Sequence, residues 1–141
     1  MRYERYTHKR QYKRYERHTS IGVKAAIKTV GKVQYSVDGK TGWQDTIPDN
    51  VMKVGTPLSF FIRVKETTPA NDGSFIYKFL IAAGTGDGLS LVNTDVNKAK
   101  ISGTAPEGML SKTFSVNCTV QDSYGKEVSG TALTKAWSAA A

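Results

Sequence analysis

The sequence has little of the residue types on which many active sites and metal centres depend. It contains one cysteine, Cys118, so neither an internal disulfide nor a cysteine-based zinc site can form. Its two histidines, His8 and His18, both lie in the first 20 residues, which excludes a histidine-dependent catalytic centre in the remainder of the chain. We therefore predict a protein with no enzymatic activity, no cofactor and no metal site.

Long apolar runs are also missing. No window holds 18 consecutive apolar residues, which excludes a transmembrane helix, and we expect no membrane partner. No apolar segment of a secretory signal follows the basic N-terminus, so we expect the chain to fold in a reducing cytoplasm. The length of 141 residues, with 39% hydrophobic and 23% charged residues, is typical of one globular domain.

Positive charge is concentrated at the N-terminus. The formal net charge is +8, and residues 1–20 hold seven Lys or Arg against two Glu. Residues 21–141 hold thirteen Lys or Arg against ten Asp or Glu. The chain therefore divides into a basic arm and a nearly neutral domain.

Arginine and tyrosine interleave in the arm, and the pattern that begins at Arg2 recurs at Arg14. The arm has no Leu, Ile, Val, Phe or Trp, so it cannot bury a core of its own. Arginine binds phosphate or carboxylate, and tyrosine stacks on bases or fills protein pockets. Three interpretations follow: a docking arm on a protein assembly, which we favour, a nucleic-acid tail, or a solvated tail. The predicted binding side chains are Arg2, Tyr3, Arg5, Tyr6, Lys9, Arg10, Tyr12, Lys13, Arg14, Tyr15 and Arg17.

The domain shows the alternation of short β-strands. The clearest strand is 112–121, where Phe114, Val116, Cys118 and Val120 point one way. Residues 58–65 alternate similarly with Phe61 outside. The run 75–82 is almost continuously apolar, which indicates a central strand buried on both faces. Further strands are predicted at 51–54, around 89–91 and 99–101, and at 126–134, with loops or turns at 67–73, 84–88 and 93–97.

The segment before these strands predicts a β-hairpin. Residues 33–47 alternate around Asp38-Gly39, a dipeptide that suits tight turns, and Tyr35, Val37 and Trp43 are expected on one face. Residues 21–31 fit a short helix or a strand, and their glycines and β-branched residues favour extended structure. Together the elements predict an all-β sandwich.

Several motifs in the domain match one family in order and spacing. They are Val54 to Phe60, Gly88-Leu89-Ser90-Leu91, Ile101-Ser102-Gly103-Thr104-Ala105-Pro106, and Phe114-Ser115-Val116 leading to Val120 through Gly125. On these motifs, residues 54–134 resemble the immunoglobulin-like, cadherin-like domains of bacterial surface proteins and phage virions. The stretch 84–88 departs from the family's usual "LPxGL".

The resemblance implies an immunoglobulin-like β-sandwich at 51–135 and no shared catalytic set. A β-hairpin or linker at 21–50 and the extended basic arm at 1–20 would precede it, and a short tail at 136–141 would follow, with Trp137 able to pin it to a neighbour. The family's motif residues are structural, because the glycines allow turns and the leucines fill the core.

Such domains usually work outside the cell, whereas this chain begins at Met1 without an export signal. A virion removes the conflict, since its proteins fold in the host cytoplasm. We therefore predict a structural protein of a bacteriophage virion, and favour a capsid decoration protein. Its partners would be capsid or other virion proteins, in many copies on a symmetric assembly. The alternatives are a tail or neck component, a nucleic-acid-binding protein that uses the arm, and a carbohydrate-binding or adhesion module that uses exposed aromatics such as Phe61 or Trp43.

The remaining candidate residues have plain structural interpretations. Cys118 is expected to be a small buried hydrophobe, and both tryptophans, Trp43 and Trp137, to be core or interface anchors rather than ligand platforms. A calcium site would need several of the turn carboxylates to converge, and turn formation is the favoured role. These carboxylates belong to Asp38, Asp72, Asp87, Asp95 and Asp122.

Overall fold

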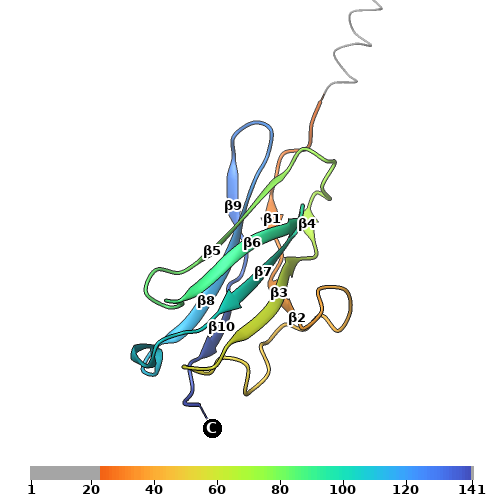
Figure 1. The fold of residues 1–141 in the computed structure, drawn as a ribbon. Coiled ribbons are helices and arrows are strands. Elements are labelled where there is room, and N and C mark those ends of the chain that lie inside the picture. The colour runs from red at the N-terminus through yellow and green to blue at the C-terminus, as the bar shows by residue number, and fades with distance from the viewer. Residues whose placement is uncertain (1–22, 141) are drawn as a thin grey trace, which may run out of the picture.

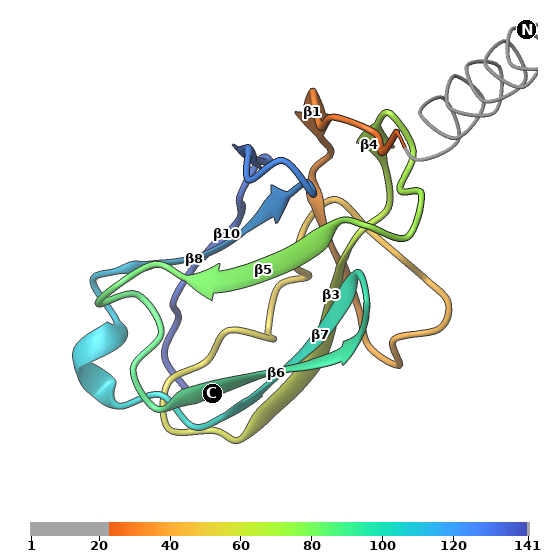
Figure 2. The same cartoon turned by 90° about the horizontal axis from the view of Figure 1, so that it is seen from above.

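The protein is all-β, with several antiparallel sheets that fit a β-sandwich (Figures 1 and 2). A computed structural model describes residues 23–140. In that part of the chain no helix is long and apolar enough to cross a membrane. The first sheet has four antiparallel strands in the order β2 (Val33–Ser36), β3 (Leu58–Val64), β7 (Lys98–Gly103) and β6 (Leu89–Asp95).

The second sheet is built around its longest strand, β8, and lies over the first as a separate layer (Figure 2). One side of β8 pairs with β5, and the other side pairs with both β9 and β10. The strands are β5 (Ile76–Ile81), β8 (Thr113–Gln121), β9 (Glu127–Ser129) and β10 (Leu133–Ala136). A small third sheet joins β1 (Thr29–Val30) to β4 (Thr67–Thr68), and a 3-10 helix, η1 (Glu107–Met109), precedes β8.

A row of four aromatic rings connects the two layers through the core. Tyr35 on β2 contacts Phe60 on β3, with ring centroids 5.3 Å apart. Phe60 contacts Phe114 on β8 at 6.2 Å, and Phe114 contacts Trp137 at 6.1 Å, both edge to face. The alternation predicted for β8 is confirmed, because all four of its inward side chains are fully buried. Edge-to-face rings add stability beyond the apolar area that they bury.

The segment before β1 is extended, as predicted, and a buried carboxylate fastens it to the sandwich. Asp122, at the end of β8, accepts the backbone N–H of Ile27 at 3.0 Å. Its other oxygen accepts the N–H groups of Tyr124 and Lys126, each at 2.9 Å. Burial raises the pKa of Asp122, but these three N–H donors outweigh it and hold the pKa below its usual value.

The hairpin predicted over 33–47 is wrong in extent. It is reduced to one bridge, in which Tyr35 and Gln44 exchange backbone hydrogen bonds of 2.8 Å. The strand ends at Ser36, and β2 pairs along its length with β3, so it is an edge strand of the first sheet. Tyr35 is buried and Val37 is exposed, so the two do not share a face as expected. Val37 lies beyond the last paired residue, where the strand alternation no longer applies.

The prediction that residues 75–82 form a strand buried on both faces is also wrong. β5 is an edge strand, and its even-numbered residues point away from the core. Leu80 is 74% exposed, and Ile76 is exposed as well, whereas Tyr77 and Phe79 between them are buried. Nothing in the described part of the chain covers the outer face of this strand.

Residues 51–54 do not form the predicted strand, and they pack against the C-terminal tail. Val54 donates its N–H to the carbonyl of Ser138 at 3.0 Å, and Ser138 donates to Met52 at 3.0 Å. Trp137 is buried, and its Nε1 donates to the carbonyl of Thr85 at 2.7 Å. The tail is therefore pinned within its own sandwich. β6 also continues to Asp95, through part of the turn predicted at 93–97.

Candidate functional site

All eleven partner-binding side chains predicted in the arm, from Arg2 to Arg17, lie outside the described residues. Within residues 23–140, three surface features stand out: a cluster of cations and aromatic rings, a polar pocket, and two exposed apolar strand edges.

The first feature lies on the outer face of the first sheet, the one that contains β2, β3, β7 and β6, and is called here the cation–aromatic face. The Cζ atom of Arg63 lies 4.4 Å from the centre of the Trp43 ring. The ammonium of Lys98 lies 5.7 Å from the same ring, and that of Lys100 lies 5.7 Å from the ring of Phe61. At these distances a cation is attracted to the electron-rich face of a ring.

Strand register brings these residues together. Arg63 on β3 stands opposite Lys98 on β7, and Phe61 stands opposite Lys100. Arg63 also donates from Nε to the side-chain oxygen of Gln34 on β2, at 3.0 Å, and burial lowers the pKa of its guanidinium. Arginine nevertheless stays charged at neutral pH. Phe61 lies on the outer side of its strand, as the alternation predicted.

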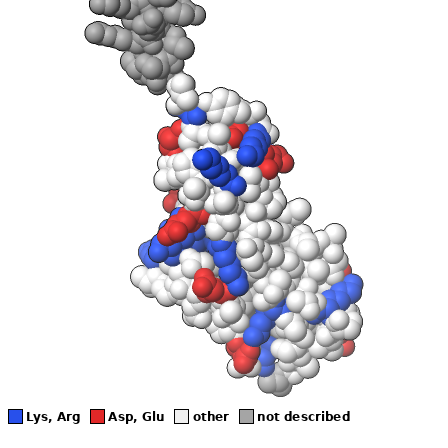
Figure 3. All heavy atoms as spheres, turned by 180° about the vertical axis from the view of Figure 1, so that it is seen from behind, with Lys and Arg blue, Asp and Glu red and all other residues white. Residues whose placement is uncertain are grey.

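The cations of this face have no acidic partner within the described residues. No carboxylate there lies within 4.0 Å of Arg63, Lys98 or Lys100. The other sheet differs, because two of its lysines form ion pairs, Lys78 with Glu127 and Lys135 with Asp49. Figure 3, which looks at the molecule from behind, shows positive and negative side chains intermixed on that side. What distinguishes the cation–aromatic face is that its unpaired cations lie against aromatic rings.

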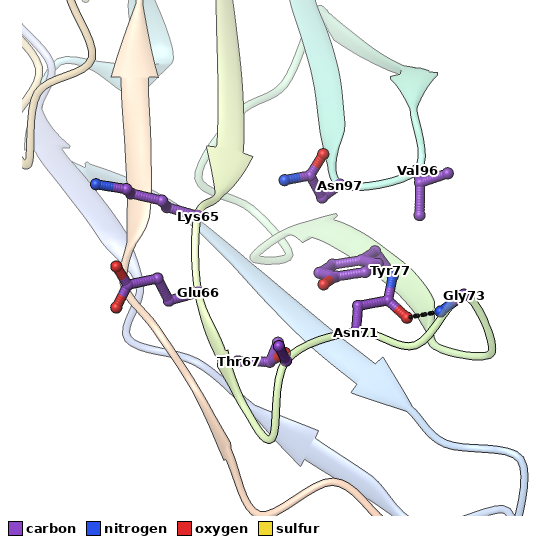
Figure 4. A pocket seen from close by; sticks show the side chains of 9 residues that line it. Lys65, Glu66, Thr67, Asn71, Gly73, Tyr77, Val96 and Asn97 are labelled. Atoms are coloured by element: carbon purple, nitrogen blue, oxygen red, sulfur yellow. Dashed lines mark hydrogen bonds between the residues drawn. The ribbon is translucent and has the colours of Figure 1, made fainter. Parts of the chain in front are cut away.

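The second feature is a pocket of about 650 Å³ beside the ends of β3 and β5 (Figure 4). Tyr77 is 8% exposed, and the hydroxyl end of its ring is directed toward the middle of the pocket. Asn71 accepts the N–H of Gly73 at 2.9 Å, and Asn97 donates to the carbonyl of Val64 at 2.8 Å, which fixes both amides. The lining residues are Lys65, Glu66, Thr67, Ala70, Asn71, Gly73, Tyr77, Val96 and Asn97.

The Tyr77 side chain lies beside Thr67 and Asn71, which line the same pocket (Figure 4). Burial raises the pKa of this phenol, while the neighbouring side chains of Thr67 and Asn71 act in the opposite direction. The hydroxyl is therefore protonated at neutral pH and can both donate and accept a hydrogen bond. With the two fixed amides, it equips the pocket to hold a small polar ligand.

The third feature is the pair of edge strands on the same side of the sandwich, β5 and β6. Each pairs with a single neighbour in the described part of the chain, β5 with β8 and β6 with β7. The exposed large apolar side chains on or next to these strands are Ile76, Leu80, Val92 and Val96. Apolar side chains beside a free strand edge favour contact with another chain.

The remaining candidates have structural roles. Cys118 is fully buried, and burial raises the pKa of its thiol to about 12, which confirms the prediction of a small hydrophobe. Asp38 accepts N–H groups of its own turn, and those of Thr41 and Lys40 hold its pKa below the usual value. Trp137 is a core anchor, as expected. No group of three or more His, Cys, Asp or Glu that could hold a metal occurs among the residues described.

Comparison with known proteins adds a distant structural likeness. No family model matches the sequence, and no curated protein does. Among solved structures, the chain is similar to a mutant of the SrpA adhesin from Streptococcus sanguinis, with a TM-score of 0.44 and 13% sequence identity. The match covers 79% of this chain and 60% of the adhesin chain, so this protein spans less than two thirds of that chain.

Proposed function

We propose that this chain is a non-enzymatic structural protein that packs in many copies into a bacteriophage virion, as a decoration protein of the capsid. The observation that carries the proposal is the exposed apolar surface on the edge strands β5 and β6. We further propose that the sandwich has an immunoglobulin-like arrangement, and the resemblance of residues 54–134 to domains of phage virions supports this setting. The Tyr/Arg arm would add a second contact to neighbouring subunits.

The surroundings of Leu80 suit a protein interface. On the same face of the second sheet, Leu80 stands opposite Asn117, and Ile76 stands opposite Gln121. Apolar side chains are thus bordered by polar ones, as in interfaces between proteins that also exist apart. A weak contact of this kind becomes strong when it repeats over a lattice, because many copies bind together.

Replacing Leu80 with lysine tests the proposal. The side chain is 74% exposed, so Leu80→Lys leaves the core intact, while it places a charge in the apolar contact. We expect association with the particle to fall by about tenfold or more, which corresponds to a loss of roughly 1.4 kcal/mol. The measurement is co-sedimentation of the tagged full-length chain with particles from its source, beside a chain that lacks residues 1–20.

Val23→Lys is the matched control, because it also replaces an apolar side chain with lysine, at a site that is 72% exposed and precedes β1. The control should sediment like the unaltered chain. If the unaltered chain does not sediment with particles from its source, the proposed virion role is wrong. If Leu80→Lys sediments with the particle as the unaltered chain does, the edge strands are not the contact.

A second candidate function, a carbohydrate-binding module, is favoured by the pocket around Tyr77. Its hydroxyl and the amides of Asn71 and Asn97 offer donors and acceptors in one polar hollow, which suits the hydroxyl groups of a saccharide. In this function the ligand would enter the pocket without being changed.

Tyr77→Phe tests this candidate, because it removes the hydroxyl and keeps the ring. We expect saccharide binding to weaken by about fivefold to tenfold, the effect of losing one hydrogen bond. The measurement is the NMR shift of the Asn71 and Asn97 side-chain amides during titration with a panel of mono- and disaccharides. Tyr124→Phe, which removes a hydroxyl outside the pocket, is the control. Amide signals that stay unmoved by every saccharide would exclude the candidate.

A further inference from the structure

We propose that the cation–aromatic face binds single-stranded nucleic acid. This site is separate from the arm and the pocket and borders the edge strand β6, where Val92 stands opposite Lys100, and it does not depend on the function proposed above. Three cations and two rings lie side by side on the outer face of one sheet: Trp43, Phe61, Arg63, Lys98 and Lys100.

The first argument is an electrostatic conflict in the unliganded protein. Arg63 and Lys98 stand directly opposite each other on neighbouring antiparallel strands, an arrangement that is destabilising for like charges. Trp43 offsets part of the repulsion, because both cations lie within 6 Å of its ring. Asp95 stands opposite Lys98 on β6, but its Oδ1 accepts the N–H of Val96 at 2.7 Å and it forms no ion pair with Lys98. A negatively charged ligand would relieve the conflict.

The second argument is that Arg63 is held in position before any ligand arrives. Its Nε donates to Gln34, and Gln34 donates in turn to a carboxylate oxygen of Asp45 at 2.9 Å. The Trp43 ring supports the guanidinium from one side. Within residues 23–140 the terminal nitrogens have no hydrogen-bond partner, so they are left for a ligand, and a guanidinium offers phosphate two parallel hydrogen bonds. Positioning the group in advance lowers the entropy that binding must overcome.

The third argument concerns the kind of polyanion. A single strand of nucleic acid presents phosphates and flat bases together, which matches cations interleaved with aromatic rings. The open outer face of a sheet can accept an extended strand, and a guanidinium supported by a ring can stack on a base. The net charge of +8 adds long-range attraction for a polyanion. Acidic proteins and sulfated polysaccharides carry charges without bases, so they match less of this surface.

The protein contains its own probe, because it has two tryptophans and Trp137 is buried in the core. In the full-length Trp137→Phe variant, all tryptophan fluorescence comes from Trp43. We expect a twelve-nucleotide oligothymidylate to quench this fluorescence, with an affinity that falls as salt rises. Lys98→Gln and Lys100→Gln should each weaken binding by about fivefold and reduce the salt slope by about 0.7. Lys78→Gln removes the same charge from the other sheet and should have little effect.

A second readout separates a binding role from a structural one. Lys98→Glu places a carboxylate opposite both Arg63 and Asp95, so one new attraction and one new repulsion oppose each other, and we expect the midpoint of thermal unfolding of the unliganded protein to change by less than about 2 °C. The same substitution should abolish quenching by the oligonucleotide. The proposal is overturned if the oligonucleotide binds without changing Trp43 fluorescence, or if polyglutamate or a sulfated polysaccharide quenches Trp43 at equal affinity. A fall in the unfolding midpoint of Lys98→Glu by more than about 5 °C would show that Lys98 has a structural role, and it would likewise overturn the proposal.

Discussion

Gly103→Ala is expected to lower the free energy of unfolding by about 3–5 kcal/mol, because it combines a steric clash with an unfavourable backbone angle. The φ angle of Gly103 is +138°, a conformation that residues with a side chain rarely adopt. A Cβ atom at this position would lie 2.2 Å from the backbone carbonyl oxygen of Gly88. Because the clash involves backbone atoms, no side-chain rotation can relieve it.

The close approach at Gly103 is mutual. A Cβ on Gly88, where φ is +82°, would lie 2.1 Å from the carbonyl oxygen of Thr104. The start of β6 and the end of β7 therefore touch through their backbones, at the point where Leu89 pairs with Gly103. From the sequence, the glycines of these two motifs were expected to serve turns. The structure adds that they allow two strands to lie in contact.

Urea unfolding followed by circular dichroism measures this effect, and two other glycines serve as controls. Gly125 has a φ of +87° but open space around it, so Gly125→Ala should lose about 1 kcal/mol from the backbone angle alone. Gly108 has neither constraint, and Gly108→Ala should change stability by less than about 0.5 kcal/mol. If Gly103→Ala is no worse than Gly125→Ala, the backbone contact at β6 and β7 contributes little.

Phe114→Ala is expected to destabilise the protein by about 3–5 kcal/mol. Phe114 is fully buried and stands in the middle of the aromatic row, edge to face with both Phe60 and Trp137. Removing its ring takes away the contact between the two sheets and leaves a cavity that neighbours on paired strands cannot fill without breaking their register.

The test of Phe114 is again the free energy of unfolding, with Phe114→Leu as a graded comparison. Leucine fills part of the space, so the loss should be smaller than that of alanine. Leu80→Ala removes a large apolar side chain at an exposed position and should cost less than about 0.5 kcal/mol. A loss below about 1.5 kcal/mol for Phe114→Ala would mean that the sandwich closes around the missing ring, and that the aromatic row is not a main source of stability.

The sequence predicted those parts of the fold in which the burial of a strand's side chains follows from the alternation of its own residues. The alternation of β8 identified its buried face residue by residue, and the all-β class follows from several such strands. Residues 75–82 misled because a continuous apolar run does not reveal whether another layer covers its outer face. Residues 51–54 misled because their burial depends on Ser138, more than 80 residues away. Both failures concern long-range packing, which local patterns do not carry.

The candidate site was partly foreseeable. The alternation in 58–65 predicts Phe61 and Arg63 on the outer side of their strand. Trp43 was expected to be a core or interface anchor, and it was named as an exposed aromatic only in the adhesion alternative. The cation–aromatic face as a whole was missed, because Lys98 meets Arg63 only through the register of β3 and β7. The place of Tyr77 in the pocket was missed, because its sequence neighbours form an apolar run that indicates a buried strand. The one available signal was its position beside the polar loop 67–73.

The N-terminal and C-terminal parts of the domain contact each other, and this limits how early the sandwich can be completed during synthesis. The N–H of Ile27 donates its hydrogen bond to Asp122, 95 positions later, and the aromatic row that begins at Tyr35 ends at Trp137. A ribosome delivers the early strands first, so Phe60 must wait for β8 before its ring is covered. Contacts between such distant residues slow folding, because a long loop must close at a cost in chain entropy before the contact contributes any stability. The nascent chain thus keeps an apolar surface open until its last strand emerges.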